Sequence, residues 1–326
     1  MTGYVIRRVL WMVPLLLGVS IITFAMLKHA PGDPVAAILA QARTNGAQLT
    51  AADRERLRKQ YGLDKPAYEQ YVDWLGLVLH GNLGTSTRMN QPVTHVIGQR
   101  LPNTMKLAGV SLVLTLLIAI PLGIISAVKQ YSLLDYVLTS FNFIGISLPQ
   151  FWLALMLLFF LAVKVGWFPV NGMHSAYVQG GFWAHFKDSA LHFVLPVISI
   201  TLTGLASYMR YQRASMLEVL NHDFVRTARA KGVGERSVIL LHAWRNSLIP
   251  IITLLGYVFV ILVEGSVVVE TIYSWPGMGS LAVESLTQRD YPMVMGIVLL
   301  SAALILLGTL VSDLLYALAD PRVRYD

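Results

Sequence analysis

The chain has 326 residues, of which 55% are apolar and only 13% are charged, and its mean hydropathy is +0.60. These values exclude an ordinary water-soluble domain and predict an integral membrane protein, because the apolar residues form long uninterrupted runs. The net charge of +7 is explained by basic segments beside a membrane, so no nucleic-acid partner is expected.

Six segments meet or approach the length needed to cross a bilayer, whose hydrocarbon core requires roughly 20 apolar helical residues. We place them at about Val9–Leu27, Leu107–Val128, Tyr136–Val163, Phe193–Met209, Ser247–Val263 and Met293–Ser312. The third is long enough to be tilted or broken near Pro149, which lacks a backbone donor. The sequence therefore predicts an all-α membrane protein with six transmembrane helices.

The first apolar run resembles a secretory signal in one respect, since Arg7 and Arg8 precede it. No small-x-small cleavage pattern closes the run, and its 19 uncharged residues exceed an ordinary signal core. We expect residues 1–28 to be a retained N-terminal transmembrane helix.

Residues 29–104 are predicted to form an extracytoplasmic region after this helix. Pro and Gly punctuate its start at 31–34, and a charged helix is expected at Ala51–Gln60. A region of this size without a cross-link has a marginal core of its own, so it should pack on the membrane helices or on a partner.

The basic residues set the predicted orientation. Twelve of the 25 lysines and arginines lie in residues 1–8, 129–135, 210–246 and 319–326. The two short connections on the other side contribute only Lys164, Lys187 and Arg289. Because basic residues concentrate on the cytoplasmic side of membrane proteins, both termini and the segment 210–246 are predicted to be cytoplasmic.

Five polar residues near the membrane segments are candidates for a translocation path: Asn142, Ser147, Gln150, Glu264 and Glu270. A carboxylate at bilayer depth is costly unless it is paired or faces water. Structural pairing is the favoured interpretation for Glu264, and both interpretations stay open for Glu270. The three residues of the third segment either line a path for a polar solute or satisfy the backbone near Pro149.

Catalytic motifs are absent from the sequence. There is no Gly-Lys dipeptide and therefore no P-loop, and neither His-Glu-x-x-His nor Gly-x-Ser-x-Gly occurs. The chain has no cysteine, and its eight histidines are scattered, which argues against a buried metal site. We expect no catalytic residue, no metal and no cofactor bound by this chain.

The predicted cytoplasmic segment contains a polar stretch, Asp223–Gly232, followed after nine residues by His242–Pro250. Five basic residues stand against only Asp223 and Glu235: Arg226, Arg229, Lys231, Arg236 and Arg245. Its alanines favour short helices, and Gly232 suits a tight turn between them. The stretch is predicted to be a docking surface rather than a membrane span.

The two parts of this stretch, Arg226–Gly232 and His242–Pro250, resemble the EAA loop of permease subunits of binding-protein-dependent ABC importers. Further motifs across almost the whole chain resemble the B-type permease of oligopeptide and dipeptide importers: Ala30–Pro34, Gly81–Gly84, Leu101–Thr104, Glu270–Gly279, Arg289–Pro292 and Asp320–Tyr325. Arg226-Thr-Ala replaces Glu-Ala-Ala in the loop, as is usual in the peptide-permease branch.

The resemblance implies a type I ABC importer permease fold with an extracytoplasmic insertion, and a permease core at 105–326 with its coupling loop at 213–246. The chain would form half of a pore with a C-type permease, in a bacterial cytoplasmic (inner) membrane. Two ATPase subunits would bind ATP and Mg, and a solute-binding protein would deliver the substrate. The implied ATPase-coupling residues are Asp223, Arg226, Thr227, Ala228, Arg229, Ala230, Lys231, Gly232, His242, Arg245, Asn246 and Pro250.

Alternative functions differ in their energy source or substrate. Nickel and glutathione importers share these motifs with the favoured di- or oligopeptide importers. A secondary transporter would work without ATP, but such proteins usually show internal repeats and intramembrane ionisable relays, which this sequence lacks. A membrane enzyme using Glu264 or Glu270 as a base would need a partner group that the sequence does not show.

Overall fold

The computed structural model describes residues 2–29, 51–60, 64–248, 250–251 and 267–319. Within these ranges every regular secondary-structure element is a helix, apart from an isolated β-bridge between Thr85 and Pro92. The chain divides into two compact units, residues 1–103 with 277–306 and residues 104–276 with 307–326. The predicted all-α class is confirmed. The predicted three-part division at residues 28 and 104 stays a prediction.

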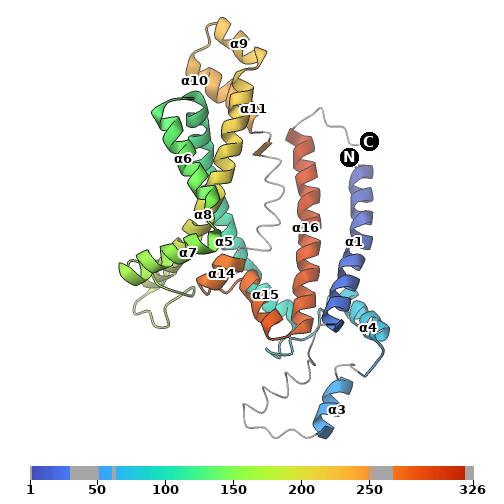
Figure 1. The fold of residues 1–326 in the computed structure, drawn as a ribbon. Coiled ribbons are helices and arrows are strands. Elements are labelled where there is room, and N and C mark those ends of the chain that lie inside the picture. Colours follow the sequence, from blue (N-terminus) through green and yellow to red (C-terminus); the bar gives the residue numbers. More distant parts are fainter. Residues whose placement is uncertain (1, 30–50, 61–63, 249, 252–266, 320–326) are drawn as a thin grey trace. The chain divides into compact units, whose positions relative to one another are not determined.

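The first unit carries the N-terminal helices and the starts of two long ones (Figure 1). Its elements are α1 (Thr2–His29), α3 (Ala51–Gln60), α4 (Ala67–Leu79), the beginning of α5 (Val93–Val128), α15 (Met278–Thr287) and the beginning of α16 (Tyr291–Ala319). Its buried core joins the start of α5 to α15 and α16 through Val93, Val96, Ile97, Met278, Leu281, Met293 and Ile297. The charged helix predicted at Ala51–Gln60 is confirmed by α3.

A buried carboxylate fixes the start of α16. Asp290 accepts hydrogen bonds from the hydroxyl groups of Ser86 and Thr87 and from the Thr87 amide at 3.1 Å. Its side chain also accepts from the Met293 amide at 3.4 Å, which satisfies a donor in the first turn of α16. The segment after Gly84 is thus tied to α16, although Ser86 and Asp290 are 204 positions apart.

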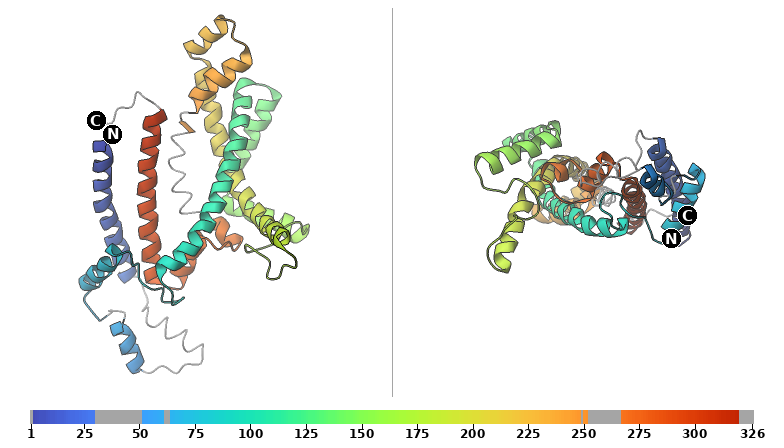
Figure 2. Two further views of the ribbon diagram at one scale, coloured as in Figure 1. Left: turned by 180° about the vertical axis from the view of Figure 1, so that it is seen from behind. Right: turned by 90° about the horizontal axis from the view of Figure 1, so that it is seen from below.

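The second unit contains the remaining helices. In chain order they are the rest of α5, α6 (Leu133–Ser147), α7 (Gln150–Leu157), the π-helix η1 (Leu158–Lys164), α8 (Phe182–Leu220), α9 (Asp223–Ala230), α10 (Glu235–Ser237), the π-helix η2 (Val238–Ala243), α11 (Trp244–Ser247), α14 (Val267–Ile272) and the end of α16. Figures 1 and 2 show α6 lying along α8, with α9 and α10 beyond the end of α8.

Glycines allow close packing around α8. A Cβ atom at Gly123 of α5 would lie 2.7 Å from Cβ of Gln212 and 2.9 Å from the carbonyl oxygen of Met209. A Cβ at Gly145 of α6 would lie 3.1 Å from Cβ of Ala206. At Gly123 the backbone of α5 therefore approaches α8 too closely for any larger residue without a shift.

Among the described residues, four helices are long and apolar enough to span a membrane: Gly3–His29, Val93–Val128, Phe182–Leu220 and Tyr291–Leu314. A fifth span results if the bent pair Leu133–Ser147 and Gln150–Lys164 counts as one. These contain the first, second, third, fourth and sixth predicted spans. Most of the predicted span Ser247–Val263 lies outside the described residues.

The predicted break in the third span is confirmed. The two helices of the bent pair meet at 101°, and Leu148 and Pro149 lie between them. Pro149 has φ −61° and ψ 135°, an extended conformation that ends α6 and starts α7.

Helices α5 and α8 extend far beyond the predicted spans. Helix α5 has 36 residues, about 54 Å at 1.5 Å per residue, which exceeds the hydrocarbon thickness of about 30 Å. It starts at Val93, inside the region expected to precede the membrane core, and α8 extends the predicted Phe193–Met209 in both directions. The length of an apolar run predicts only the part of a helix that lies in lipid. The extension at the start of α5 packs on α15 and α16 through Val93, Val96 and Ile97, whereas the start of α8 at residues 182–187 is mostly exposed.

Candidate coupling site and transport path

Helix α9, expected to dock an ATPase, has two distinct faces. Val225 is completely buried and Ala228 is 8% exposed, and both pack against Met216 and Val219 of α8. Arg226, Thr227 and Ala230 are exposed, as is Asp223. At 100° per residue, these four exposed residues lie on the face of α9 opposite Val225 and Ala228. Phe224 and Arg229 lie at the two edges between the faces. The helix therefore presents a polar face with one small residue, Ala230.

Two of the implied coupling residues, Ala228 and Ala230, lie on different faces of α9. Ala228 lies in the chain's own core cluster, and its part in ATPase coupling stays a prediction. The spacing from Val225 to Ala228 places both on the face that packs against α8. Ala230 is the alanine that remains accessible.

Gly232 ends α9 as predicted. Its φ is +79°, in the left-handed region that favours glycine. The Gly232 amide donates to the carbonyl of Arg229 at 3.0 Å, and the Val233 amide donates to the carbonyl of Ala228 at 3.2 Å. These two bonds form a Schellman motif, which satisfies the last carbonyl groups of the helix. The predicted helix end is confirmed to within one residue.

An ion pair closes the corner after Gly232. Nη2 of Arg229 lies 2.7 Å from Oε1 of Glu235, and Nε donates to Oε2 at 3.1 Å. These hydrogen bonds lower the pKa of the Glu235 carboxyl and raise the pKa of Arg229. Both groups therefore stay charged near neutral pH. The pair is surface-exposed, so it orients the corner more than it stabilises the fold.

The second part of the loop, α10, η2 and α11, is continuously helical from Glu235 to Ser247. Two helices joined by a tight turn were predicted, and this is confirmed. The implied coupling residues His242, Arg245, Asn246 and Pro250 are all exposed. Asn246 donates from Nδ2 to the carbonyl of His242 at 2.7 Å, which uses its amide locally.

The loop is attached to the membrane helices by a buried cluster. Val238 and Ala243 of η2 join Val225 and Ala228 in packing against α8 and against Ala127 of α5. Nearby, the completely buried Gln212 of α8 donates from Nε2 to Oγ of Ser247 at 2.8 Å. Force applied to α9 would thus reach α8 and the end of α5 through packed side chains.

A buried ion pair that sequence reasoning missed lies on α6 and α8. Arg213 donates from Nε to Oδ1 and from Nη2 to Oδ2 of Asp135, both at 2.9 Å. Asp135 also accepts from the Ser126 hydroxyl, the Tyr131 amide and the Thr139 hydroxyl. Its side chain is 4% exposed. The sequence shows Arg213 only as one of many basic residues, and its partner is 78 positions away.

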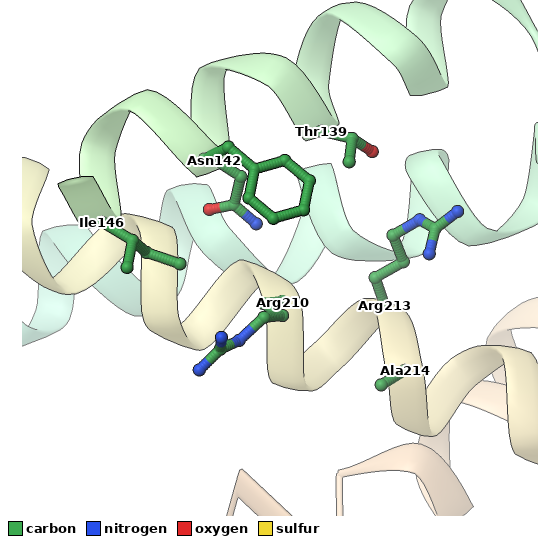
Figure 3. A pocket seen from close by; sticks show the side chains of 7 residues that line it. Thr139, Asn142, Ile146, Arg210, Arg213 and Ala214 are labelled. Atoms are coloured by element: carbon green, nitrogen blue, oxygen red, sulfur yellow. The ribbon is translucent and has the colours of Figure 1, made fainter.

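A pocket of about 140 Å³ lies between α6 and α8 near this pair. It is lined by Thr139, Asn142, Phe143, Ile146, Arg210, Arg213 and Ala214. Figure 3 shows Asn142 on α6 directed toward α8, from which Arg210 and Arg213 extend. Asn142 is 6% exposed, and its Oδ1 has no hydrogen-bond partner in the part of the chain that the structure describes. A buried acceptor without a donor is unfavourable, so this oxygen is suited to meet a donor from a ligand.

The other expected path residues are placed differently. Ser147 is exposed and donates from Oγ to the carbonyl of Phe143 at 2.8 Å, four residues earlier in the same helix. Gln150 lies in the first turn of α7 and is half-buried. Glu270 is completely buried and accepts from Oγ1 of Thr104 at 2.7 Å, which supports structural pairing. Glu264 lies outside the described residues.

The long apolar helices are those of a multi-pass membrane protein. Residues 119–325 match the family described as binding-protein-dependent transport system inner membrane component. Residues 1–108 match the family of the N-terminal part of such membrane components. The chain belongs to the binding-protein-dependent transport system inner membrane component family.

Relatives and a solved structure agree with this assignment. The chain is 43% identical over 326 residues to the oligopeptide transport system permease protein AppB of Bacillus subtilis (strain 168), with full coverage of both. It is 37% identical over 339 residues to the di/tripeptide transport system permease protein DppB of Pseudomonas aeruginosa (strain UCBPP-PA14), covering 100% and 99% of the two chains.

A structure of the MetNI methionine ABC transporter in inward-facing conformations matches with a TM-score of 0.57 at 15% identity. The match covers 71% of this chain and 100% of that one. The predicted type I ABC importer permease fold is confirmed by this likeness.

Proposed function

We propose that this chain is the transmembrane permease subunit of an ATP-driven importer of di- or oligopeptides. The observation that carries the substrate class is the full-length similarity to permeases named for oligopeptide and di/tripeptide transport. The protein would lie in a bacterial cytoplasmic (inner) membrane with both termini in the cytoplasm, as its basic residues favour.

The proposed complex has three kinds of partner chain. A C-type permease forms a heterodimer with this chain and supplies the other half of the pore. Two cytoplasmic ATPase subunits bind ATP and Mg and carry the hydrolytic activity, and an extracytoplasmic protein binds the solute. The exposed polar face of α9 and the basic residues around it support ATPase docking at this loop.

The proposed coupling mechanism uses α9 as a rigid lever. Its buried face is packed against α8 and α5, and its exposed face is available to the ATPase. Closure of two ATPase subunits on ATP would move α9, and α8 would follow because the two are joined by a packed core. The permease would shift from an inward-open to an outward-open state, since the ATPase binds the two states differently.

A reconstitution experiment tests the importer proposal. The chain is purified with its associated subunits, and ATP hydrolysis is measured with and without the solute-binding protein loaded with a dipeptide. Hydrolysis stimulated by the loaded binding protein is expected, and Gly232→Pro should abolish the stimulation, because proline cannot adopt φ +79° or donate to Arg229.

Gly234→Pro is the matched control. Gly234 has φ −59° and open space around a Cβ atom, so proline suits its conformation. Equal loss of stimulation in both variants would argue against the α9 lever. Solute movement by this chain alone, without ATP, would instead establish a secondary transporter, and uptake confined to nickel or glutathione would reject the peptide substrate.

We also propose that Asn142 contacts the peptide on its path. Its buried Oδ1, unpaired among the described residues, lies in a pocket that Arg210 also lines, so a backbone N–H of the peptide would find an acceptor there. Replacing an unsatisfied buried amide by an apolar group is nearly neutral for folding. Asn142→Leu should therefore raise the KM of peptide uptake without lowering thermal stability.

Ser147→Ala serves as the control for this path, because Ser147 is exposed and bonds only to backbone within its own helix. Its uptake should be unchanged. A normal KM in Asn142→Leu would show that Asn142 does not contact the peptide. Its pocket would then be only a packing defect.

A further inference from the structure

Helix α4 contacts α1 at a residue that lies inside the membrane span of α1. The hydroxyl of Tyr71 lies 2.8 Å from Oγ of Ser20, and the rings of Tyr71 and Phe24 are 5.4 Å apart, edge to face. Ser20 belongs to the span Gly3–His29 and stands nine residues before its end, about 14 Å along the helix. Figure 1 and the left view of Figure 2 place α4 at the C-terminal end of α1.

The polar residues of α4 lie at the level where α1 leaves the hydrocarbon. Nζ of Lys28 donates to Oε1 of Gln70 at 3.0 Å, next to the basic end of α1. Asp73 pairs with Lys65 at 2.5 Å, and both side chains are about half exposed. At 100° per residue, Glu69, Gln70 and Asp73 form one polar arc of the helix.

An apolar stripe on a different side of α4 is exposed. Tyr68 is 69% exposed, Val72 62% and Leu79 79%. Their spacing of four and seven residues aligns them on one face of the helix. This stripe adjoins the face that packs on α1 through Tyr71, so the apolar surface continues from the packed face onto the exposed one.

We propose that α4 is an interfacial amphipathic helix whose stripe of Tyr68, Val72 and Leu79 lies in the acyl region of the leaflet around the C-terminal half of α1. The occupant of this surface is lipid hydrocarbon. The Ser20–Tyr71 contact sets the depth, because it joins α4 to a residue inside a membrane span. The polar arc beside Lys28 faces the headgroups, as in other helices that lie in the plane of a membrane.

This inference is independent of the transported solute. It assigns part of the predicted extracytoplasmic region to the membrane surface. A helix held in the interface by both α1 and lipid would anchor the segment that leads through the Asp290 contacts to the start of α16.

Because the chain has no cysteine, single cysteines can be introduced without removing native ones. Spin labels are placed at Val72→Cys and Leu79→Cys on the stripe, and at Glu69→Cys and Asp73→Cys on the polar arc. The full chain is reconstituted with its partner subunits in liposomes, and collision rates with oxygen, which partitions into lipid, and with a water-soluble nickel chelate are measured by power saturation.

The ratio of oxygen to nickel collisions is expected to be higher at residues 72 and 79 than at residues 69 and 73. If the ratio of oxygen to nickel collisions is the same on the stripe and on the polar arc, and the nickel chelate collides strongly with both, then α4 lies in water. That result would overturn the proposal. Protection of residues 72 and 79 from both reagents would also overturn it, since a protein partner would then cover the stripe. All four positions are at least partly exposed in the structure, so labelling should not disturb the fold.

Discussion

Ala230→Glu is expected to abolish peptide uptake while leaving the protein folded in the membrane. Ala230 lies on the exposed face of α9, opposite the residues that pack against α8. In the proposed complex this face meets the ATPase, and a carboxylate buried there without a partner would cost several kcal/mol, about a hundredfold or more in affinity. Uptake and ATPase recovery on purification should both fall, and they are measured in proteoliposomes and by co-purification.

The same substitution at Ala228 separates docking from folding. Ala228 is 8% exposed and packs with Val225 and Val238, so Ala228→Glu should disrupt the loop itself and lower the melting temperature. Ala230→Glu should keep the melting temperature of the unmodified protein. Normal uptake by Ala230→Glu would show that the exposed face of α9 does not carry the ATPase contact.

Local signals in the sequence were sufficient for several features of this fold. The break of the third span follows from one proline, and the end of α9 follows from one glycine that adopts a positive φ. The charged helix α3 was predicted with its bounds. Each of these features depends on backbone constraints or composition over a few neighbouring residues, which a single sequence contains.

Features that depend on distant partners could not be predicted. The hydroxyl groups of Ser86 and Thr87 donate to Asp290 across about 200 positions, and the family motifs at Gly81–Gly84 and Arg289–Pro292 do not indicate that these segments meet. Nothing in the sequence links Asp135 to Arg213, because both are polar residues at the edges of apolar runs. Such pairs are set by the packing of helices, which is a tertiary property.

The coupling loop illustrates the same limit at the scale of one helix. The sequence predicts its short helices, its turn at Gly232 and its basic character, but it does not distinguish Ala228 from Ala230. A helix of eight residues has too few apolar positions to define its buried face from sequence alone. The contacts with Met216 and Val219 decide the face, and they depend on where α8 ends.

Breaking the Asp135–Arg213 pair is expected to destabilise the protein more than any change of a surface charge. Asp135→Asn retains the size of the side chain but removes the carboxylate that accepts two hydrogen bonds from Arg213. It also weakens the acceptor for Ser126 and Thr139. Removing one partner of a buried pair typically costs 3–5 kcal/mol, and since the Arg213 side chain is 26% exposed we expect about 3 kcal/mol.

Asp223→Asn is the matched control for this prediction. Asp223 is 97% exposed and lies 3.6 Å from Arg226, so its loss should change stability by no more than about 0.5 kcal/mol. Thermal unfolding of both variants in the same lipid nanodiscs measures the difference. If Asp135→Asn and Asp223→Asn both have the melting temperature of the unmodified protein, the buried pair does not hold α6 to α8. A clear drop confined to Asp135→Asn would instead show that the pair keeps these helices together beneath the coupling loop.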